Sequence, residues 1–125
     1  MEQGISESMV DARSKERVSE LIEDAVKKGA CISAGGDREG MLDQASVVDG
    51  VTPAMRIYSE ESFGPVVTVI RVNGDEEALR VANDTEYGLT AAILSRDLAR
   101  GWTLASLVQT GICHIKTSRR CFSVA

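Results

Sequence analysis

The chain has 125 residues, 43% of them hydrophobic, and its 14 basic and 19 acidic side chains give a net charge of −5. This size suits one globular domain, and no apolar run approaches the ~20 residues of a membrane span, so we expect no membrane partner. The negative charge would repel a phosphate backbone, which excludes nucleic acid as an expected partner, and the absence of a secretory signal predicts a cytoplasmic protein.

An amphipathic helix is predicted over residues 13–28. Apolar side chains recur there at intervals of three and four residues, which would place them on one face. They are Val18, Leu21, Ile22, Ala25 and Val26. Lys27 and Lys28 suit the negative end of a helix dipole, and Gly29 suits the left-handed residue that commonly follows.

Two short strands are predicted after this helix. Residues 30–34 should form a buried strand that ends in a turn at 35–40, and residues 45–48 should form a weaker strand. The glycines of that turn fit neither the G-x-G-x-x-G pattern nor the P-loop, so no phosphate site is expected there. Pro53 and the charged stretch at residues 56–61 predict a loop.

A nearly unbroken β-branched run at residues 66–72 predicts the next strand. Such a run is typical of a strand covered on both faces, so we expect it inside the sheet. After a turn at Asn73 and Gly74, Asp75 should cap a short helix that ends near Asn83.

The strand–helix unit then repeats. A strand is predicted at residues 90–95, Asp97 should cap the following helix, and Gly111 should precede a strand at residues 112–115. This alternation predicts an α/β fold in which helices cover the faces of a largely parallel sheet.

The three cysteines are too few and too scattered for a disulfide framework or a four-ligand zinc site, so we expect reduced thiols and no metal site. Cys113 and His114 are adjacent in a predicted strand, so their side chains should point to opposite faces and not form a nucleophile and base pair. Cys113 should be a buried small hydrophobe, and Cys31 invites the same interpretation. Cys121 falls in the C-terminal segment.

Two segments resemble specific motifs of the aldehyde dehydrogenase superfamily. Residues 60–66 read Glu-Glu-Ser-Phe-Gly-Pro-Val, and residues 82–89 read Ala-Asn-Asp-Thr-Glu-Tyr-Gly-Leu. With weaker similarities the resemblance covers residues 8–115, and it implies a three-layer α/β/α portion of the catalytic domain of an NAD(P)-dependent enzyme. Residues 116–125 turn basic and lose periodicity, so we expect a partial catalytic domain over 1–115 and an unrelated tail over 116–125.

The resemblance implies half of a cofactor site. Glu61 matches a glutamate that accepts hydrogen bonds from the nicotinamide ribose hydroxyls, although it could be a solvated loop carboxylate like Glu60. Phe63 matches an aromatic residue beside the same ribose, with core packing as the alternative. Leu89 corresponds to an apolar residue near the nicotinamide, but a leucine that leads into a buried strand is more often a core residue.

The resemblance also implies that the catalytic groups lie outside these residues. In the family a cysteine thiolate attacks the aldehyde, hydride passes to NAD(P), and a glutamate-activated water releases the carboxylic acid. No cysteine here matches that nucleophile, and the base and the glycine-rich cofactor domain belong to other segments. We therefore expect a truncated aldehyde dehydrogenase-like protein that is inactive, and binds no NAD or NADP, as an isolated chain.

Uncovered sheet edges and helix faces would favour a homodimer or larger homo-oligomer. Two other hypotheses stay open. The chain could be an interaction or regulatory module that pairs with a full-length dehydrogenase, or it could work in trans with a separate fragment that carries the nucleophile. The aldehyde and the preference for NAD over NADP depend on residues outside this segment.

Overall fold

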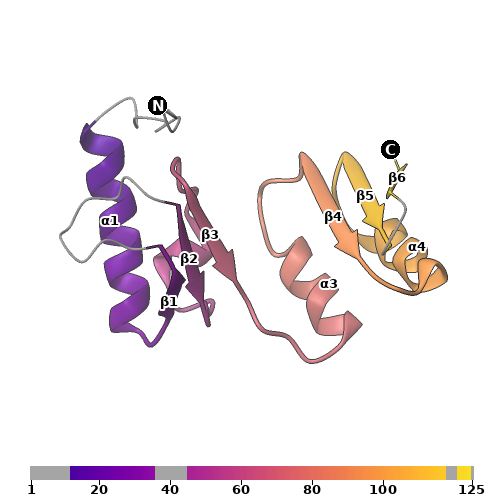
Figure 1. The fold of residues 1–125 in the computed structure, drawn as a ribbon, viewed down its shortest axis with the longest axis horizontal. Helices are drawn as coiled ribbons and strands as arrows, with labels where there is room; N and C mark the ends of the chain where they lie inside the picture. The colour runs from indigo at the N-terminus through magenta and orange to yellow at the C-terminus, as the bar shows by residue number, and fades with distance from the viewer. Residues whose placement is uncertain (1–11, 36–44, 118–120, 125) are drawn as a thin grey trace, which may run out of the picture. The chain divides into compact units, whose positions relative to one another are not determined.

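The computed structural model describes residues 12–35, 45–117 and 121–124. It divides into two compact units, residues 1–71 and 72–125, and each unit has its own three-stranded sheet (Figure 1). The α/β class is confirmed, since helices alternate with strands and both sheets combine a parallel and an antiparallel pair. The turn expected at residues 36–40 lies outside the described residues.

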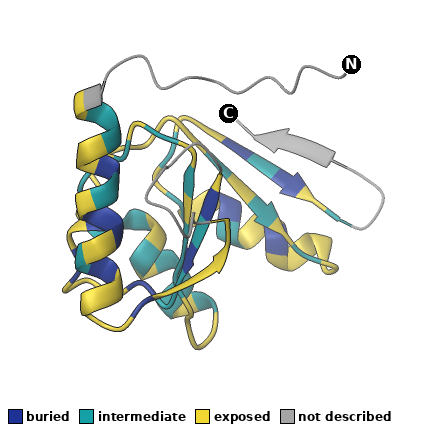
Figure 2. Cartoon of the chain, turned by 60° about the vertical axis from the view of Figure 1, so that its left-hand side comes forward, coloured by how far each residue is buried: buried dark blue, intermediate teal, exposed yellow. Residues whose placement is uncertain are grey.

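The predicted first helix is confirmed as α1 (Ala12–Lys27). Its buried stripe consists of Val18, Leu21, Ile22 and Ala25 (Figure 2). Val26 was expected on this stripe but is 45% exposed, because it lies at the margin of the stripe in the last turn.

The end of α1 is a Schellman motif. Gly29 has a φ of +105°, a conformation that glycine adopts without a Cβ penalty. Ala30 N–H donates to the Ala25 carbonyl at 3.0 Å, and Gly29 N–H donates to the Val26 carbonyl at 3.1 Å. These two bonds satisfy carbonyls that the helix itself leaves without donors.

The sheet of the first unit has the order β1-β2-β3, with β1 at Cys31–Ala34, β2 at Ser46–Asp49 and β3 at Val66–Val69. β1 is antiparallel to β2, and β3 is parallel to it. All residues of β1 are exposed, so the predicted burial of this strand and of Cys31 is wrong. An edge strand has a neighbour on one side only, which leaves its side chains less covered.

β3 is also an edge strand, since no described strand pairs with its outer side. Val67 is 60% exposed, so the prediction of an interior strand covered on both faces is wrong. The β-branched run correctly predicted the strand, but coverage depends on neighbours that the sequence of the run does not encode.

The core of the first unit forms where α1 packs against β2 and the segment after it. That segment contributes buried side chains from Val51, Met55 and Ile57. Residues 56–61 were expected to be a loop, yet Arg56–Ser59 form the short helix α2. Burial of Ile57 in the α1 core supplies tertiary packing that local charge patterning did not predict.

The second unit contains α3 (Asp75–Asn83), β4 (Thr90–Leu94), α4 (Leu98–Leu107) and β5 (Ile112–Lys116), all close to their predicted bounds. Asp97 caps α4 as expected, because its side chain accepts from Arg100 N–H at 3.1 Å. Asp75 does not cap α3: Gly74 is the N-cap, and the Asp75 carboxylate pairs with the Arg100 guanidinium.

β5 is the central strand of the second sheet, parallel to β4 and antiparallel to β6 (Cys121–Val124). The backbone of Cys121–Val124 thus forms a strand where the sequence predicted an irregular tail. Ala105 of α4 packs on Cys113 and Ile115 of β5, which make a small core. No helix among the described residues is long and apolar enough to cross a membrane.

Candidate functional site

Residues 60–65 connect α2 to β3 and carry two of the predicted site residues, Glu61 and Phe63. Both side chains are exposed. Phe63 is 73% exposed, so the alternative of core packing is wrong for this residue. A large aromatic ring held in solvent on a short connection is available for a partner or a ligand.

The far end of this loop is held by backbone hydrogen bonds. Gly64 N–H donates to the Ser62 carbonyl at 3.0 Å, and Val66 N–H donates to the Gly64 carbonyl at 2.8 Å. Ser46 N–H donates to the Pro65 carbonyl at 2.8 Å, which ties the loop to the start of β2.

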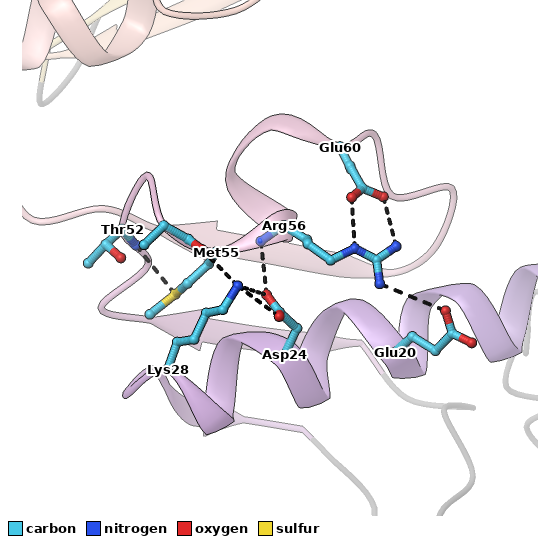
Figure 3. A network of polar contacts seen from close by, with 8 residues as sticks. Glu20, Asp24, Lys28, Thr52, Met55, Arg56 and Glu60 are labelled. Atoms are coloured by element: carbon cyan, nitrogen blue, oxygen red, sulfur yellow. Dashed lines mark hydrogen bonds and ion pairs between the residues drawn. The ribbon is translucent and has the colours of Figure 1, made fainter.

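The near end of the loop is held by an ion pair between Arg56 and Glu60. Arg56 Nε and Nη2 donate to the two carboxylate oxygens of Glu60 at 2.8 and 3.1 Å (Figure 3). Arg17 Nη2 of α1 lies 3.8 Å from the same carboxylate. The hydrogen bonds from Arg56, followed by its charge and that of Arg17, hold the pKa of Glu60 below its usual range.

Asp24 joins α1 to the beginning of α2. Its carboxylate accepts from the Arg56 backbone N–H at 2.9 Å and from Lys28 Nζ at 2.9 to 3.1 Å. Lys28 Nζ also donates to the Ala54 carbonyl at 2.8 Å. The Arg56 N–H bond, and then the Lys28 contact, lowers the pKa of Asp24, so this carboxylate is ionised at neutral pH.

Glu61 differs from Glu60 beside it. Among the described residues, none hydrogen-bonds to or forms an ion pair with the Glu61 carboxylate, which is exposed. The backbone of Glu60 is extended, with φ −84° and ψ 133°, so the chain leaves the helix α2 at this residue. The Glu60 carboxylate is therefore occupied by Arg56, whereas the exposed Glu61 carboxylate keeps its acceptor oxygens open to hydroxyl donors.

Leu89, the third predicted site residue, lies in the second unit immediately before β4. Its side chain is 84% exposed, so the expectation that it is a core residue is wrong. Its backbone is nevertheless fixed, because Gly111 N–H donates to the Gly88 carbonyl at 2.8 Å and Ile112 N–H donates to the Leu89 carbonyl at 3.3 Å. β5 thus holds the backbone while the side chain remains in solvent.

Cys113 and His114 do not form a catalytic pair. Cys113 is 2% exposed and His114 lies on the other face of β5, as alternation predicts. Burial raises the pKa of the Cys113 thiol, which keeps it protonated and poorly nucleophilic at neutral pH. The part of the chain that the structure describes contains no group of three His, Cys, Asp or Glu residues able to hold a metal.

The structure thus brings Glu61 and Phe63 together on one loop and places Leu89 in the other unit. Sequence reasoning missed the residues that hold the loop, Asp24 and Arg56 above all. One signal was available for Arg56, since Arg56 and Glu60 are spaced i, i+4 as oppositely charged pairs are in helices. No local signal linked Asp24 to Arg56, which is 32 residues away.

Comparison with known proteins relates this chain to a family. Residues 4–123 match the sequence model of the Aldehyde dehydrogenase family. A vanillin dehydrogenase of Pseudomonas sp. strain HR199 is 50% identical over 113 residues, which are 90% of this chain and 24% of that protein. The chain resembles the crystal structure of a salicylaldehyde dehydrogenase from Pseudomonas putida complexed with salicylaldehyde, with a TM-score of 0.78 and 40% identity over 87% of this chain and 22% of the other.

A second solved structure is similar to the same extent. It is an NADP-dependent glyceraldehyde-3-phosphate dehydrogenase from Bacillus halodurans complexed with NADP, with a TM-score of 0.81 and 37% identity over 90% of this chain and 24% of the other. The chain therefore spans 22% to 24% of the length of these relatives. Because the family match covers nearly the whole chain, the protein belongs to the aldehyde dehydrogenase family.

Proposed function

We propose that the loop at residues 60–65 supplies the ribose-binding part of an NAD(P) site in an aldehyde dehydrogenase. The observation that carries the proposal is the Glu61 carboxylate, which is exposed and has no partner among the described residues although its loop is held at both ends. Two carboxylate oxygens match two adjacent ribose hydroxyls as hydrogen-bond acceptors. NAD(P), when bound, supplies the acceptor for the hydride that leaves the substrate.

Phe63 would contribute an apolar contact beside the ribose, and Leu89 is proposed separately, as an apolar contact that the second unit offers to a nicotinamide ring. Phe63 follows Glu61 by two residues and is 73% exposed, so its ring is free to pack beside the ribose. Leu89 is 84% exposed on a fixed backbone, which suits an apolar contact near the nicotinamide. Cofactor sites commonly combine such apolar surfaces with a few well-placed polar groups.

The family activity proposed for the complete enzyme is oxidation of an aldehyde to a carboxylic acid. Aromatic aldehydes are the proposed substrate class, because relatives named for vanillin and salicylaldehyde are 50% and 43% identical to the chain. We propose that the 125 residues alone do not perform this reaction. The proposed location of the protein is the cytoplasm. Cys113 is buried and protonated, and no other cysteine matches the family nucleophile.

A chimera tests this proposal. Residues 8–115 would replace the aligned segment of the Pseudomonas vanillin dehydrogenase, with the unaltered enzyme as the control. We expect NAD-dependent vanillin oxidation by the chimera and none by the isolated chain. Vanillin oxidation by the isolated chain, in proportion to its concentration, would contradict the proposed division of roles.

A second candidate function is pairing with a full-length dehydrogenase or with another copy of this chain. It is favoured by large apolar side chains that are exposed, among them Val67 on the edge strand β3 at 60% and Leu94 on β4 at 76%. Light scattering should then report a dimer or larger, and a tagged chain should co-purify with the dehydrogenase. A monomer that captures no dehydrogenase would exclude this candidate.

A further inference from the structure

We infer that Arg56, Glu60 and Asp24 are positioning residues that hold Glu61 in the orientation in which it meets the ribose hydroxyls of a nicotinamide nucleotide. The inference rests on the proposed function for its ligand. Its physical basis is a set of contacts between α1, α2 and the loop, none of which involves Glu61 itself (Figure 3).

The first step is how Glu60, the residue before Glu61, is held. Two hydrogen bonds between Arg56 and Glu60 fix both the position and the plane of the Glu60 carboxylate, which a single contact would not do. Glu60 N–H also donates to the Arg56 carbonyl at 2.9 Å, so the backbone and the side chain of Glu60 are both held by Arg56. Because Glu61 directly follows Glu60 in the chain, holding the backbone and the side chain of Glu60 also fixes the point from which the Glu61 side chain leaves the backbone.

The second step is the anchorage of Arg56. α2 has only four residues, too few to be stable without tertiary contacts. The side chain of its N-cap residue, Met55, makes no capping bond, and Asp24 of α1 instead accepts the first helical N–H. Lys28 holds Asp24 and also reaches the Ala54 carbonyl, so α2 is tied to α1 at its beginning.

The third step separates positioning from overall stability. Arg56 and Glu60 side chains are 44% and 34% exposed, and ion pairs at such positions contribute little to the free energy of unfolding. The core of the first unit is built instead from buried apolar side chains, including a full stripe of α1. Loss of the Arg56–Glu60 pair should therefore loosen residues 60–63 and leave the fold intact.

Nuclear magnetic resonance of the full chain tests this directly. In Arg56→Gln and in Glu60→Gln, we expect the heteronuclear NOE of the Glu61 and Phe63 amides to fall, with little change in Tm. Arg100→Gln is the matched control, because it removes another exposed Arg–carboxylate pair, with Asp75, in the second unit. Its effect should stay outside residues 60–63.

Two results would overturn the inference. One is unchanged NOE values at Glu61 and Phe63 in both variants of the pair. The other is a cooperative loss of structure throughout the first unit in both variants, which would make the pair a stability element and not a positioning one.

The chimera separates this inference from the proposed function. There, Arg56→Gln should raise KM for NAD roughly three- to tenfold, with a smaller change in kcat, because a displaced Glu61 weakens cofactor binding. If Glu61→Gln has no effect in the chimera, the proposed function fails, whatever the amide data show. If Glu61→Gln weakens NAD binding and Arg56→Gln does not, the positioning role alone is refuted.

Discussion

Gly101 of α4 lies directly over Ile115 of β5, and a Cβ at Gly101 would stand 2.9 Å from Ile115 Cγ2. Ile115 is fully buried, and its Cγ2 is attached to a branched carbon that cannot swing aside. We expect Gly101→Ala to destabilise the second unit by about 1 kcal/mol, since overpacking exceeds the gain of about 1 kcal/mol in helix propensity. Urea unfolding followed by circular dichroism measures this change.

The partner substitution checks the cause. In an Ile115→Ala background the obstructing methyl group is gone, so Gly101→Ala should become neutral or stabilising. Ile115→Ala alone should cost about 2–5 kcal/mol, as large-to-small changes in a core do. An equal cost of Gly101→Ala in both backgrounds would show that contact with Ile115 is not the reason.

Asp24 should make the thermal stability of the first unit depend on pH. Its pKa is lower in the folded chain than in the unfolded chain, so its ionised form stabilises the fold above the usual carboxyl pKa of about 4. This contribution is lost as the pH falls through the lowered folded value. Asp24→Asn should therefore have a lower Tm than the parent at pH 7, with the difference shrinking below about pH 4. A difference that is the same at pH 7 and at pH 3 would contradict the assignment.

Gly29 should resist substitution because of its backbone and not because of crowding. Its φ is +105°, and among the described residues no heavy atom beyond Gly29 and its chain neighbours lies within 4 Å of where a Cβ would be. Gly29→Ala should cost about 1–2 kcal/mol from backbone strain alone. Val26→Ala, which trims a half-exposed side chain in the same turn, is the control and should cost less. A neutral Gly29→Ala would show that the Schellman motif is dispensable.

Thiol reactivity should distinguish Cys31 from Cys113. Cys31 is exposed, whereas Cys113 is buried and its thiol pKa is raised by burial. In a Cys121→Ser background, an aromatic disulfide reagent should modify one thiol rapidly and the second only as the chain opens or is unfolded. Rapid loss of both thiols in the native chain would contradict the burial of Cys113.

Much of the fold could be predicted because its signals are local. The stripe of α1 recurs with helical spacing, and the cap at Asp97 precedes α4 directly, so both helices were predicted correctly. Burial of β1 and β3 was predicted wrongly because it depends on which strands lie next to them. The helix α2 was missed because Asp24, whose carboxylate accepts its first N–H, is 32 residues away in sequence.

For the candidate site, the sequence predicted which residues take part but not how exposed they are or what holds them. Glu61, Phe63 and Leu89 followed from motifs, and their cofactor role stays a prediction. Their exposure could not be obtained from the sequence, and for Leu89 the apolar character pointed to the core instead. Predicting the Arg56–Glu60 pair would have required knowing where α2 begins and what lies beside it.

The most direct test of the account is the KM for NAD of the vanillin dehydrogenase chimera with and without Glu61→Gln. Gln retains the size of the side chain and removes the charge that makes it a strong acceptor, so KM should rise about tenfold, while the control Arg100→Gln leaves it unchanged. Equal KM values in the chimera and in its Glu61→Gln variant would contradict the central claim that this loop binds the nicotinamide ribose.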